Sequence, residues 1–292
     1  MKKFQQKKGV LLGLCLLAGT TVSAQALRNV RPVTADGEYH SPVWSPDGER
    51  LLFTDAHNDA LFVLDLQDQQ PAKKVREGTG IGYLADWSAD GKAILFREQA
   101  DGHSFAHLKV KSLNLASGKE QELTSVHPDQ LKRPSRANGR AAQETIVYIN
   151  PETLQLEAKR GIDGKPWVIT PEEGQYYAPI VSPDGKSVVV HEGAHMYVYP
   201  VNGKGKRQDL GIGLATSWKP DNSEVLTFED QSSDGHHVTG SELFLVDVQD
   251  SHKLQLTRSP DLIETWGDIS PNGKKVAFSD EKSGKIFIAD LP

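Results

Sequence analysis

Short apolar runs recur along the chain at a nearly constant interval, and each follows a cluster of turn-forming residues. The runs are rich in β-branched and aromatic side chains, and no segment shows the three- to four-residue spacing of an amphipathic helix. They cover Leu51–Phe53, Ala93–Phe96, Val188–Val190, Val225–Phe228 and Val276–Phe278. The pattern predicts an all-β protein of short strands joined by tight turns.

The turn before each run has nearly the same sequence. It reads Trp-Ser-Pro-Asp-Gly where it is clearest, and its copies begin at Trp44, Trp87, Val181, Trp218 and Ile269. Proline presets the backbone of a turn, Asp or Asn bonds to its own backbone, and Gly or Asn accepts a positive φ. A second and a third strand follow in most copies. A repeat of about 40–50 residues with four strands is typical of the blades of a β-propeller.

A sixth, degenerate copy is expected between Trp87 and Val181, because this interval is about twice as long as the others. Its turn would be Ser135–Gly139, and its strands would be Thr145–Ile149 and Leu154–Ala158. The fold class predicted is therefore an all-β, six-bladed β-propeller with four-stranded blades.

Closure of the ring is expected to involve the N-terminal strand. The last copy stops at Leu291-Pro292 after its third strand, and Arg31–Thr34 resembles a fourth strand that has no blade of its own. Thr34 precedes Trp44 by nearly the same distance as Thr257 precedes Ile269. We expect residues 28–35 to pair into the last blade, which removes two exposed sheet edges.

The first 26 residues have the pattern of a signal peptide. Four lysines precede the apolar run Gly9–Ala18, and Val22–Ala24 is a small-residue cleavage site. The run is too short for the roughly 20 residues of a membrane span. Cys15 is the only cysteine, and Leu14 before it argues against a lipoprotein. The expected organisation is a signal peptide (1–26) and a propeller (27–292), periplasmic or secreted, with no membrane insertion.

The charge of the chain argues against a nucleic-acid partner. The net charge is −6, and it becomes more negative when the four lysines of the signal peptide are removed. Binding to phosphates requires a basic surface.

The repeated turn, the strand that ends in Phe, and the strands Leu61–Leu66 and Ile286–Leu291 resemble the WD-like repeats of the TolB propeller domain. The resemblance covers residues 28–292. It implies a stand-alone propeller without the α/β domain that precedes the propeller in TolB. The same repeats occur in scaffolds, peptidase propellers and some polysaccharide lyases, so they predict the fold and leave the function open.

His191–His195 matches the zinc-protease pattern H-E-x-x-H, which needs a helix to place both imidazoles on one face. Here β-type runs flank it, so we expect a hairpin on which the two histidines face each other across the turn. A polar hairpin is favoured, and neither a metal nor a cofactor is predicted.

An acid or amide recurs in every blade at the end of the strand that follows the repeated turn. This ring could attract a cationic or metal-bridged partner, or its members could only cap turns. The second interpretation is favoured, because a repeat protein also repeats its turn chemistry. The residues are Asp55, Glu98, Asn150, Glu192, Asp230 and Asp280.

The innermost strands are expected to begin on one face of the propeller, at the mouth of the central channel. Aromatic residues with an arginine are typical of binding hot spots, although some of these side chains could instead pack beneath the loops. Two histidines of Glu229–Thr239, the longest loop between two strong strands, are added to the candidates. The candidate partner-binding residues are Tyr39, His40, Tyr83, Arg133, Tyr176, Tyr177, Glu264, Trp266, His236 and His237.

No sequence motif for catalysis accompanies these residues. The chain lacks a G-x-S-x-G motif and a Gly-rich loop that leads into a helix. We therefore interpret it as an exported, non-catalytic, monomeric module that binds a protein or peptide of the cell envelope, such as a lipoprotein. The alternative is an enzyme resembling an oligosaccharide lyase, which acts on an acidic polysaccharide with metal-binding histidines at the channel mouth and Arg133 as charge partner.

Overall fold

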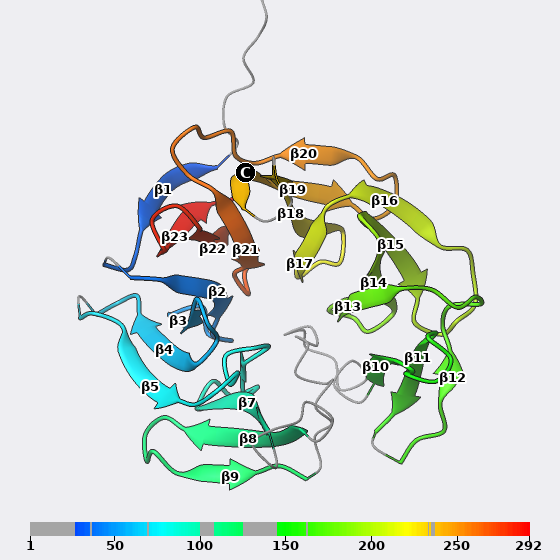
Figure 1. The fold of residues 1–292 in the computed structure, drawn as a ribbon, viewed down its shortest axis with the longest axis horizontal. Coiled ribbons are helices and arrows are strands. Elements are labelled where there is room, and N and C mark those ends of the chain that lie inside the picture. Colours follow the sequence, from blue (N-terminus) through cyan, green and yellow to red (C-terminus); the bar gives the residue numbers. More distant parts are fainter. Residues whose placement is uncertain are drawn as a thin grey trace, which may run out of the picture.

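Six antiparallel sheets stand around a central axis and form the blades of a propeller (Figure 1). The computed structural model describes residues 27–35, 37–68, 70–99, 108–124, 145–161, 163–232, 234 and 237–292. Every regular element in these ranges is a strand, which confirms the all-β, six-bladed prediction. None of these residues forms a helix with the length and apolar character needed to cross a bilayer.

In blades 1, 2, 4 and 5 the strands follow one another outward from the innermost strand in chain order. Blade 1 consists of β2 (Tyr39–Trp44), β3 (Arg50–Asp55), β4 (Ala60–Asp65) and β5 (Lys73–Glu77). Blade 2 consists of β6 (Asp86–Trp87), β7 (Ala93–Gln99), β8 (Leu108–Asn114) and β9 (Glu120–Glu122). Blade 3 shows β10 (Thr145–Ile149), β11 (Leu156–Arg160) and β12 (Trp167–Val168) among the described residues.

The remaining three blades have four strands each. Blade 4 consists of β13 (Tyr176–Val181), β14 (Ser187–Glu192), β15 (His195–Pro200) and β16 (Gln208–Ile212). Blade 5 consists of β17 (Leu214–Trp218), β18 (Glu224–Ser232), β19 (Val238–Asp247) and β20 (Lys253–Gln255). Blade 6 consists of β21 (Glu264–Ile269), β22 (Lys275–Asp280), β23 (Lys285–Asp290) and the N-terminal β1 (Arg28–Pro32).

The N-terminal strand closes the ring, as predicted. β1 pairs with β23 in antiparallel register, with Arg31 opposite Ile288 and Pro32 opposite Phe287. Leu27 is buried, and its backbone N–H donates to the carbonyl of Leu256 at 3.2 Å. The strand ends at Pro32, earlier than the expected residue 35. The degenerate copy is blade 3, although its predicted turn, Ser135–Gly139, lies outside the described residues.

The repeated turns share one hydrogen-bond pattern. In blade 4, the Ser182 hydroxyl donates to Asp184 Oδ1 at 2.7 Å and accepts the backbone N–H of Ser187 at 2.9 Å. Gly185 completes the turn with φ 72°. Blades 1, 2 and 6 repeat these bonds, with Asn272 in place of the aspartate in blade 6. The turn sequence therefore recurs because each residue type supplies one bond or one backbone angle.

The tryptophans of the turns join neighbouring blades. The indole N–H of Trp87 donates to the carbonyl of Val43 at 3.1 Å, and that of Trp218 donates to Ile180 at 3.0 Å. The indole N–H of Trp44 donates to Asp268 at 3.0 Å, across the junction between blades 6 and 1. Each bond runs to the innermost strand of the preceding blade, so the tryptophans help to fix the ring.

One expected loop is mostly strand. Glu229–Thr239 was predicted as a long loop, but β18 continues to Ser232 and β19 begins at Val238. The ladder pairs Asp230 with Ser241 and Gln231 with Gly240. The sequence did not predict this extension of β18 and β19, because both strands are exposed here and lack the alternation of apolar and polar residues that marks a half-buried strand.

Candidate functional site

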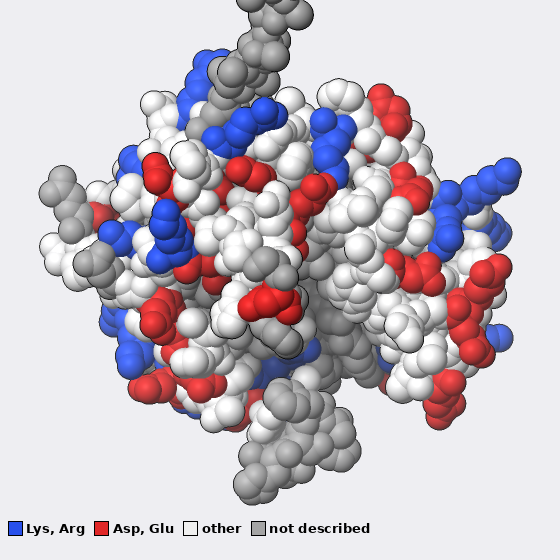
Figure 2. Space-filling view, turned by 45° about the horizontal axis from the view of Figure 1, so that its top comes forward, with Lys and Arg blue, Asp and Glu red and all other residues white. Residues whose placement is uncertain are grey.

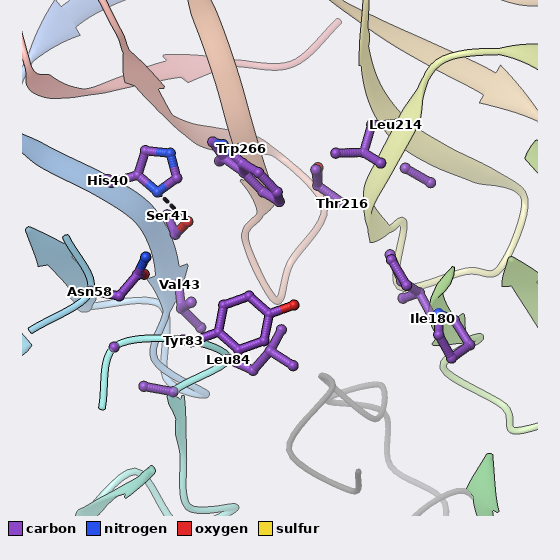
Figure 3. Close-up of a pocket in the computed structure, with 15 residues that line it drawn as sticks. His40, Ser41, Val43, Asn58, Tyr83, Leu84, Ile180, Leu214, Thr216 and Trp266 are labelled. Carbon is purple, nitrogen blue, oxygen red and sulfur yellow. Dashed lines mark hydrogen bonds between the residues drawn. The ribbon is translucent and has the colours of Figure 1, made fainter. Parts of the chain in front are cut away.

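A cavity of ≈ 220 Å³ lies where the innermost strands begin, at the mouth of the central channel (Figure 3). Five of the six blades contribute to it, so no single blade could form it. Its wall is largely apolar, and among the described residues that line it His40 is the only one with an ionisable side chain other than Tyr83. The lining residues are His40, Ser41, Val43, Asn58, Gly82, Tyr83, Leu84, Ala85, Ala178, Pro179, Ile180, Leu214, Ala215, Thr216 and Trp266.

The backbone takes an unusual conformation at this cavity. Ser41, Leu84, Ala178 and Trp266 all have a positive φ, between 45° and 61°, and all four line the cavity. In blades 1, 4 and 6 this residue lies in a β-bulge that interrupts the pairing of the innermost strand. Such a conformation costs a non-glycine residue about 1–2 kcal/mol. Strained residues held by a rigid fold cluster at functional sites, so the bulges support this cavity as the site.

Each of the two exposed aromatic rings of the cavity packs against a neighbouring side chain. The ring of Trp266, which is 36% exposed, lies 5.4 Å from that of Phe228 and 5.3 Å from that of His40. Tyr83, which is 57% exposed, lies 5.0 Å from the guanidinium of the buried Arg97. Both rings point into the cavity in Figure 3. They are therefore fixed apolar surfaces in contact with solvent, the character expected of binding residues.

His40 has a partner on each side of its ring. Its Nδ1 lies 2.7 Å from Ser41 Oγ, and its Nε2 lies 3.3 Å from Glu281 Oε1. The hydrogen bond with His40 is the main cause that lowers the pKa of Glu281, and a bond from Thr265 adds to it. The imidazole is thus fixed in orientation by a carboxylate from blade 6.

Several predicted site residues lie elsewhere. Tyr39 packs against Phe53 and Phe62, with ring centroids 5.0 and 5.2 Å apart. Tyr176 is buried in the core of blades 3 and 4, and burial is the main cause that raises its pKa to about 12. Tyr177 is 41% exposed and donates to the carbonyl of Gly193 at 2.7 Å. None of these three tyrosines lines the cavity.

Glu264 was a candidate and is fully buried at the start of β21. Burial is the main cause that raises its pKa to about 7, and the nearby carboxylates of Glu242 and Asp280 add to the effect. Its carboxyl group bonds to the hydroxyl of Ser259, while Oε2 has no partner within the described residues. Glu264 is therefore a buried carboxyl group whose ionised form is disfavoured, and it does not line the cavity.

The two histidines of the H-E-x-x-H match do not face each other, and that expectation is wrong. Glu192 lies opposite His195 in the ladder, and His191 lies opposite Met196. His195 is on the surface, where Nδ1 lies 3.1 Å from Asp209 Oδ1. The turn contains only two residues, so Glu192 and His195 are paired and lie on the same face of the sheet. His191 is next to Glu192 in the strand and therefore lies on the opposite face from His195.

His191 is a structural histidine between blades 4 and 5. The backbone N–H of Ala215 donates to its Nε2 at 2.9 Å, and its Nδ1 lies 3.3 Å from the carbonyl of Tyr177. The proton must therefore be on Nδ1, and the ring is neutral. Burial, the largest cause, lowers its pKa accordingly.

Of the remaining candidates, only His237 lies among the described residues, and it does not line the cavity. His237 is exposed, and its Nδ1 lies 2.7 Å from Asp234. Arg133 and His236 lie outside the described residues. No three His, Cys, Asp or Glu side chains come together as a metal site in the part of the chain that the structure describes.

Several cavity residues were not predicted from the sequence. The prediction concentrated on aromatic and charged side chains, whereas most of the wall consists of small or aliphatic residues, several of them at the bulges. A signal was available: each bulge residue lies three positions before the first residue of the repeated turn, as Ser41 does before Trp44 and Ala178 before Val181. Aligning the copies on the turn would have placed these residues on one ring.

The surface around the mouth agrees with this description. Figure 2 shows a hollow bordered largely by uncharged side chains, with acidic groups along its rim. Basic and acidic residues are interspersed elsewhere on this face, without a large basic patch.

Comparisons with known proteins support the fold. No family model matches the chain, and no curated protein does. A putative TolB from Agrobacterium tumefaciens matches with 16% identity and a TM-score of 0.55, covering 88% of this chain and 91% of that chain. TolB from Acinetobacter baumannii matches with 14% identity and a TM-score of 0.50, covering 87% of this chain and 63% of that chain.

An oligogalacturonate lyase from Vibrio parahaemolyticus matches to a similar extent, with 15% identity and a TM-score of 0.53. The match covers 90% of this chain and 93% of that chain. The chain therefore has a TolB-type propeller fold. The same fold occurs in a neighbour that is named as a lyase.

Proposed function

We propose that the chain is an exported interaction module, residues 27–292 after a leader of 26 residues, and that it binds a protein or peptide segment of the cell envelope at the channel mouth. The observation that carries this proposal is the shared cavity. Five blades contribute residues to its wall, four non-glycine residues with a positive φ line it, and two exposed aromatic rings point into it.

The chemistry of the wall favours a polypeptide over a highly charged ligand. A mostly apolar wall with a few fixed polar groups suits an apolar side chain flanked by peptide bonds. The acidic rim argues against polyanions. The likeness to two TolB propellers is consistent with a binding role and with a periplasmic location. Binding requires no cofactor, and a monomer presents the whole site.

The test is selection of peptides from a displayed random library on the mature protein, followed by measurement of affinity. Peptides selected on the wild type should lose at least about tenfold in affinity with Trp266→Ala, because buried aromatic anchors carry much of a binding energy. Leu254→Ala is the matched control, since this side chain is 37% exposed on the outer strand β20. Enriched peptides that bind Trp266→Ala unchanged, or a library that yields no binder, would overturn the proposal.

An oligosaccharide lyase is the second candidate, and the match to an oligogalacturonate lyase is the observation that favours it. Only one histidine, His40, lines the cavity among the described residues. Oligogalacturonate incubated with the protein and a divalent metal should give an unsaturated product if this candidate is correct. Absence of that product, together with peptide binding at Trp266, would leave the interaction module.

A further inference from the structure

The bulge residue of blade 1 carries a hydroxyl group, unlike its counterparts Leu84, Ala178 and Trp266. Ser41 Oγ lies 2.7 Å from Nδ1 of His40, whose Nε2 lies 3.3 Å from Glu281 Oε1. The contact between His40 and Ser41 is the dashed line in Figure 3. The three groups form a continuous chain from a carboxylate in blade 6 to a hydroxyl at the cavity wall in blade 1.

The direction of the protons in this chain follows from the carboxylate. The lowered pKa of Glu281 keeps it ionised near neutral pH, so it can only accept hydrogen bonds. Thr265 donates one at 2.7 Å, and when His40 carries its single proton on Nε2, that N–H donates the other. Nδ1 is then free of a proton and accepts the O–H of Ser41. A nucleophile, a base and an orienting group are arranged in this order in nucleophilic catalysis.

The backbone presents this hydroxyl to the cavity. Ser41 has φ 51°, and its backbone N–H is held by the hydroxyl of Ser279 at 3.0 Å. A strained turn that exposes a serine is a recurrent feature of enzymes that use a serine nucleophile. The roles of the two ring nitrogens are the reverse of the usual Ser-His-Asp arrangement, since Nδ1 faces the serine here.

The cavity also offers donors for a developing negative charge. Asn58, Tyr83 and Trp266 line it, and no hydrogen bond joins their side chains to another described residue. Side-chain N–H and O–H groups of this kind stabilise the oxyanion that forms when a carbonyl is attacked. Among the described residues, the wall carries no carboxylate, lysine or arginine, so a neutral carbonyl compound suits this part of it best.

The volume limits the size of that compound. A cavity of about 150 Å³ holds a molecule the size of benzene, and the present cavity is ≈ 220 Å³. We propose that Ser41 is a nucleophile that hydrolyses small, neutral acyl esters, with His40 as its general base and Glu281 as the positioning residue of His40.

The reaction balances with water as the only co-reactant. Ser41 Oγ attacks the ester carbonyl carbon as its proton passes to His40 Nδ1. The bond between the acyl carbon and the alcohol oxygen then breaks, and His40 returns the proton to that oxygen. Water attacks the acyl-serine with the help of the same nitrogen, which releases the carboxylic acid and restores Ser41.

This reactivity uses the proposed binding cavity but does not depend on a peptide partner. Peptide binding depends on Trp266, whereas nucleophilic reactivity depends on Ser41 and His40. A protein that binds selected peptides and never reacts would refute only the second proposal, and a protein that reacts and binds no peptide would refute only the first.

The test is covalent labelling of the mature protein by a fluorophosphonate, which forms a serine–phosphorus bond and releases fluoride. Mass spectrometry should locate one label per chain, on Ser41. Ser41→Gly removes the nucleophile and favours the positive φ, so it should fold and remain unlabelled. His40→Gln should slow labelling at least about 100-fold, the usual contribution of a general base.

The positioning role of Glu281 needs a separate comparison. Glu281→Gln should slow labelling about tenfold, and Glu281→Asp should restore part of the rate, while thermal unfolding confirms that each variant is folded. Hydrolysis of p-nitrophenyl acetate should follow the same order among the variants. Labelling of another serine, labelling at an unchanged rate in His40→Gln, or no label at all would overturn the proposal.

Discussion

The two ends of the innermost strands differ in what they share between blades. At the turn that follows the strand, the blades share residue types, whereas at the cavity end they share only the backbone conformation. The turn after the strand uses serine, aspartate or asparagine, and glycine for the same bonds in four blades. Three positions before the turn, the backbone has a positive φ between 45° and 61° in four blades, yet the residues are Ser41, Leu84, Ala178 and Trp266. Repetition at the turns indicates a shared structural role, while variation on a fixed backbone at the cavity indicates adaptation to a ligand.

Two carboxylates, Asp184 at a turn and Glu264 near the cavity, have pKa values shifted in opposite directions. Asp184 accepts a backbone N–H and a hydroxyl at its turn, and these bonds hold its pKa below the usual value although desolvation acts against them. Glu264, near the cavity, is buried with one oxygen unpartnered, and its pKa is raised. The ionised form of Asp184 is thus stabilised by its hydrogen bonds, whereas burial disfavours the ionised form of Glu264.

The largest difference should appear between two tryptophans. Trp44 is buried at a turn and bonds to Asp268, so Trp44→Ala should lower the free energy of unfolding by about 3–5 kcal/mol. Trp266 is half-exposed at the cavity, and Trp266→Ala should cost less than half as much. Urea unfolding of both variants measures this, and equal losses would remove the structural distinction between the two ends.

Glu264→Gln should stabilise the protein at pH 8 and have little effect at pH 4. The folded pKa of about 7 lies above the ordinary value of 4.5, so the folded state holds the extra proton between these values. The stability that Glu264 contributes is present below pH 4.5 and is lost as the pH rises through 7. The gain at pH 8 should be on the order of 3 kcal/mol. A pH-independent difference between variant and wild type in urea unfolding would contradict this.

Matched exchanges of glycine and alanine should have opposite signs at the two ends. Gly48→Ala, at a turn with φ 74°, should destabilise by about 1 kcal/mol, since its Cβ meets only an ordinary contact with Pro271 at 3.7 Å. Ala178→Gly, at the cavity with φ 45°, should stabilise by about the same amount. Thermal unfolding resolves both effects, and a destabilising Ala178→Gly would show that the bulge carries no strain.

The smallest effect is expected for Asp184→Asn. Asn272 makes the same bonds in blade 6, accepting the hydroxyl of Ser270 at 2.8 Å and the N–H of Lys274 at 3.0 Å. The loss at pH 7 should therefore stay below about 1 kcal/mol, the difference between a charged and a neutral acceptor. It should disappear in acid, because an aspartate with a lowered pKa stabilises only while it is ionised. A loss of several kcal/mol in urea unfolding would show that the turns require the charge.

The fold could be predicted from the sequence because the turn end repeats. Trp44, Trp87 and Trp218 mark the blades, and the spacing of Thr34 was enough to place β1 beside β23. The degenerate blade was found from the length of an interval alone, and β10 confirmed it.

The site could be predicted only in part, because the cavity end does not repeat its side chains. His40, Tyr83 and Trp266 were predicted and line the cavity, whereas Tyr39 and Tyr176 pack into the core, because successive side chains of a strand point to opposite faces. Bulges leave no mark in composition, and His40, which contacts Ser41, reaches Glu281 only across about 240 residues of the chain. Only the closed ring brings that carboxylate to the cavity.

The central claim is that ligands bind where the backbone repeats and the side chains vary. The most direct measurement is a map of amide chemical shifts, by NMR, as a peptide selected on the mature protein is added. Shifts should concentrate in residues 40–43, 82–85, 178–180, 214–216 and 266, and the repeated turns should not respond. Shifts confined to the outer strands, or to the turns themselves, would contradict the account.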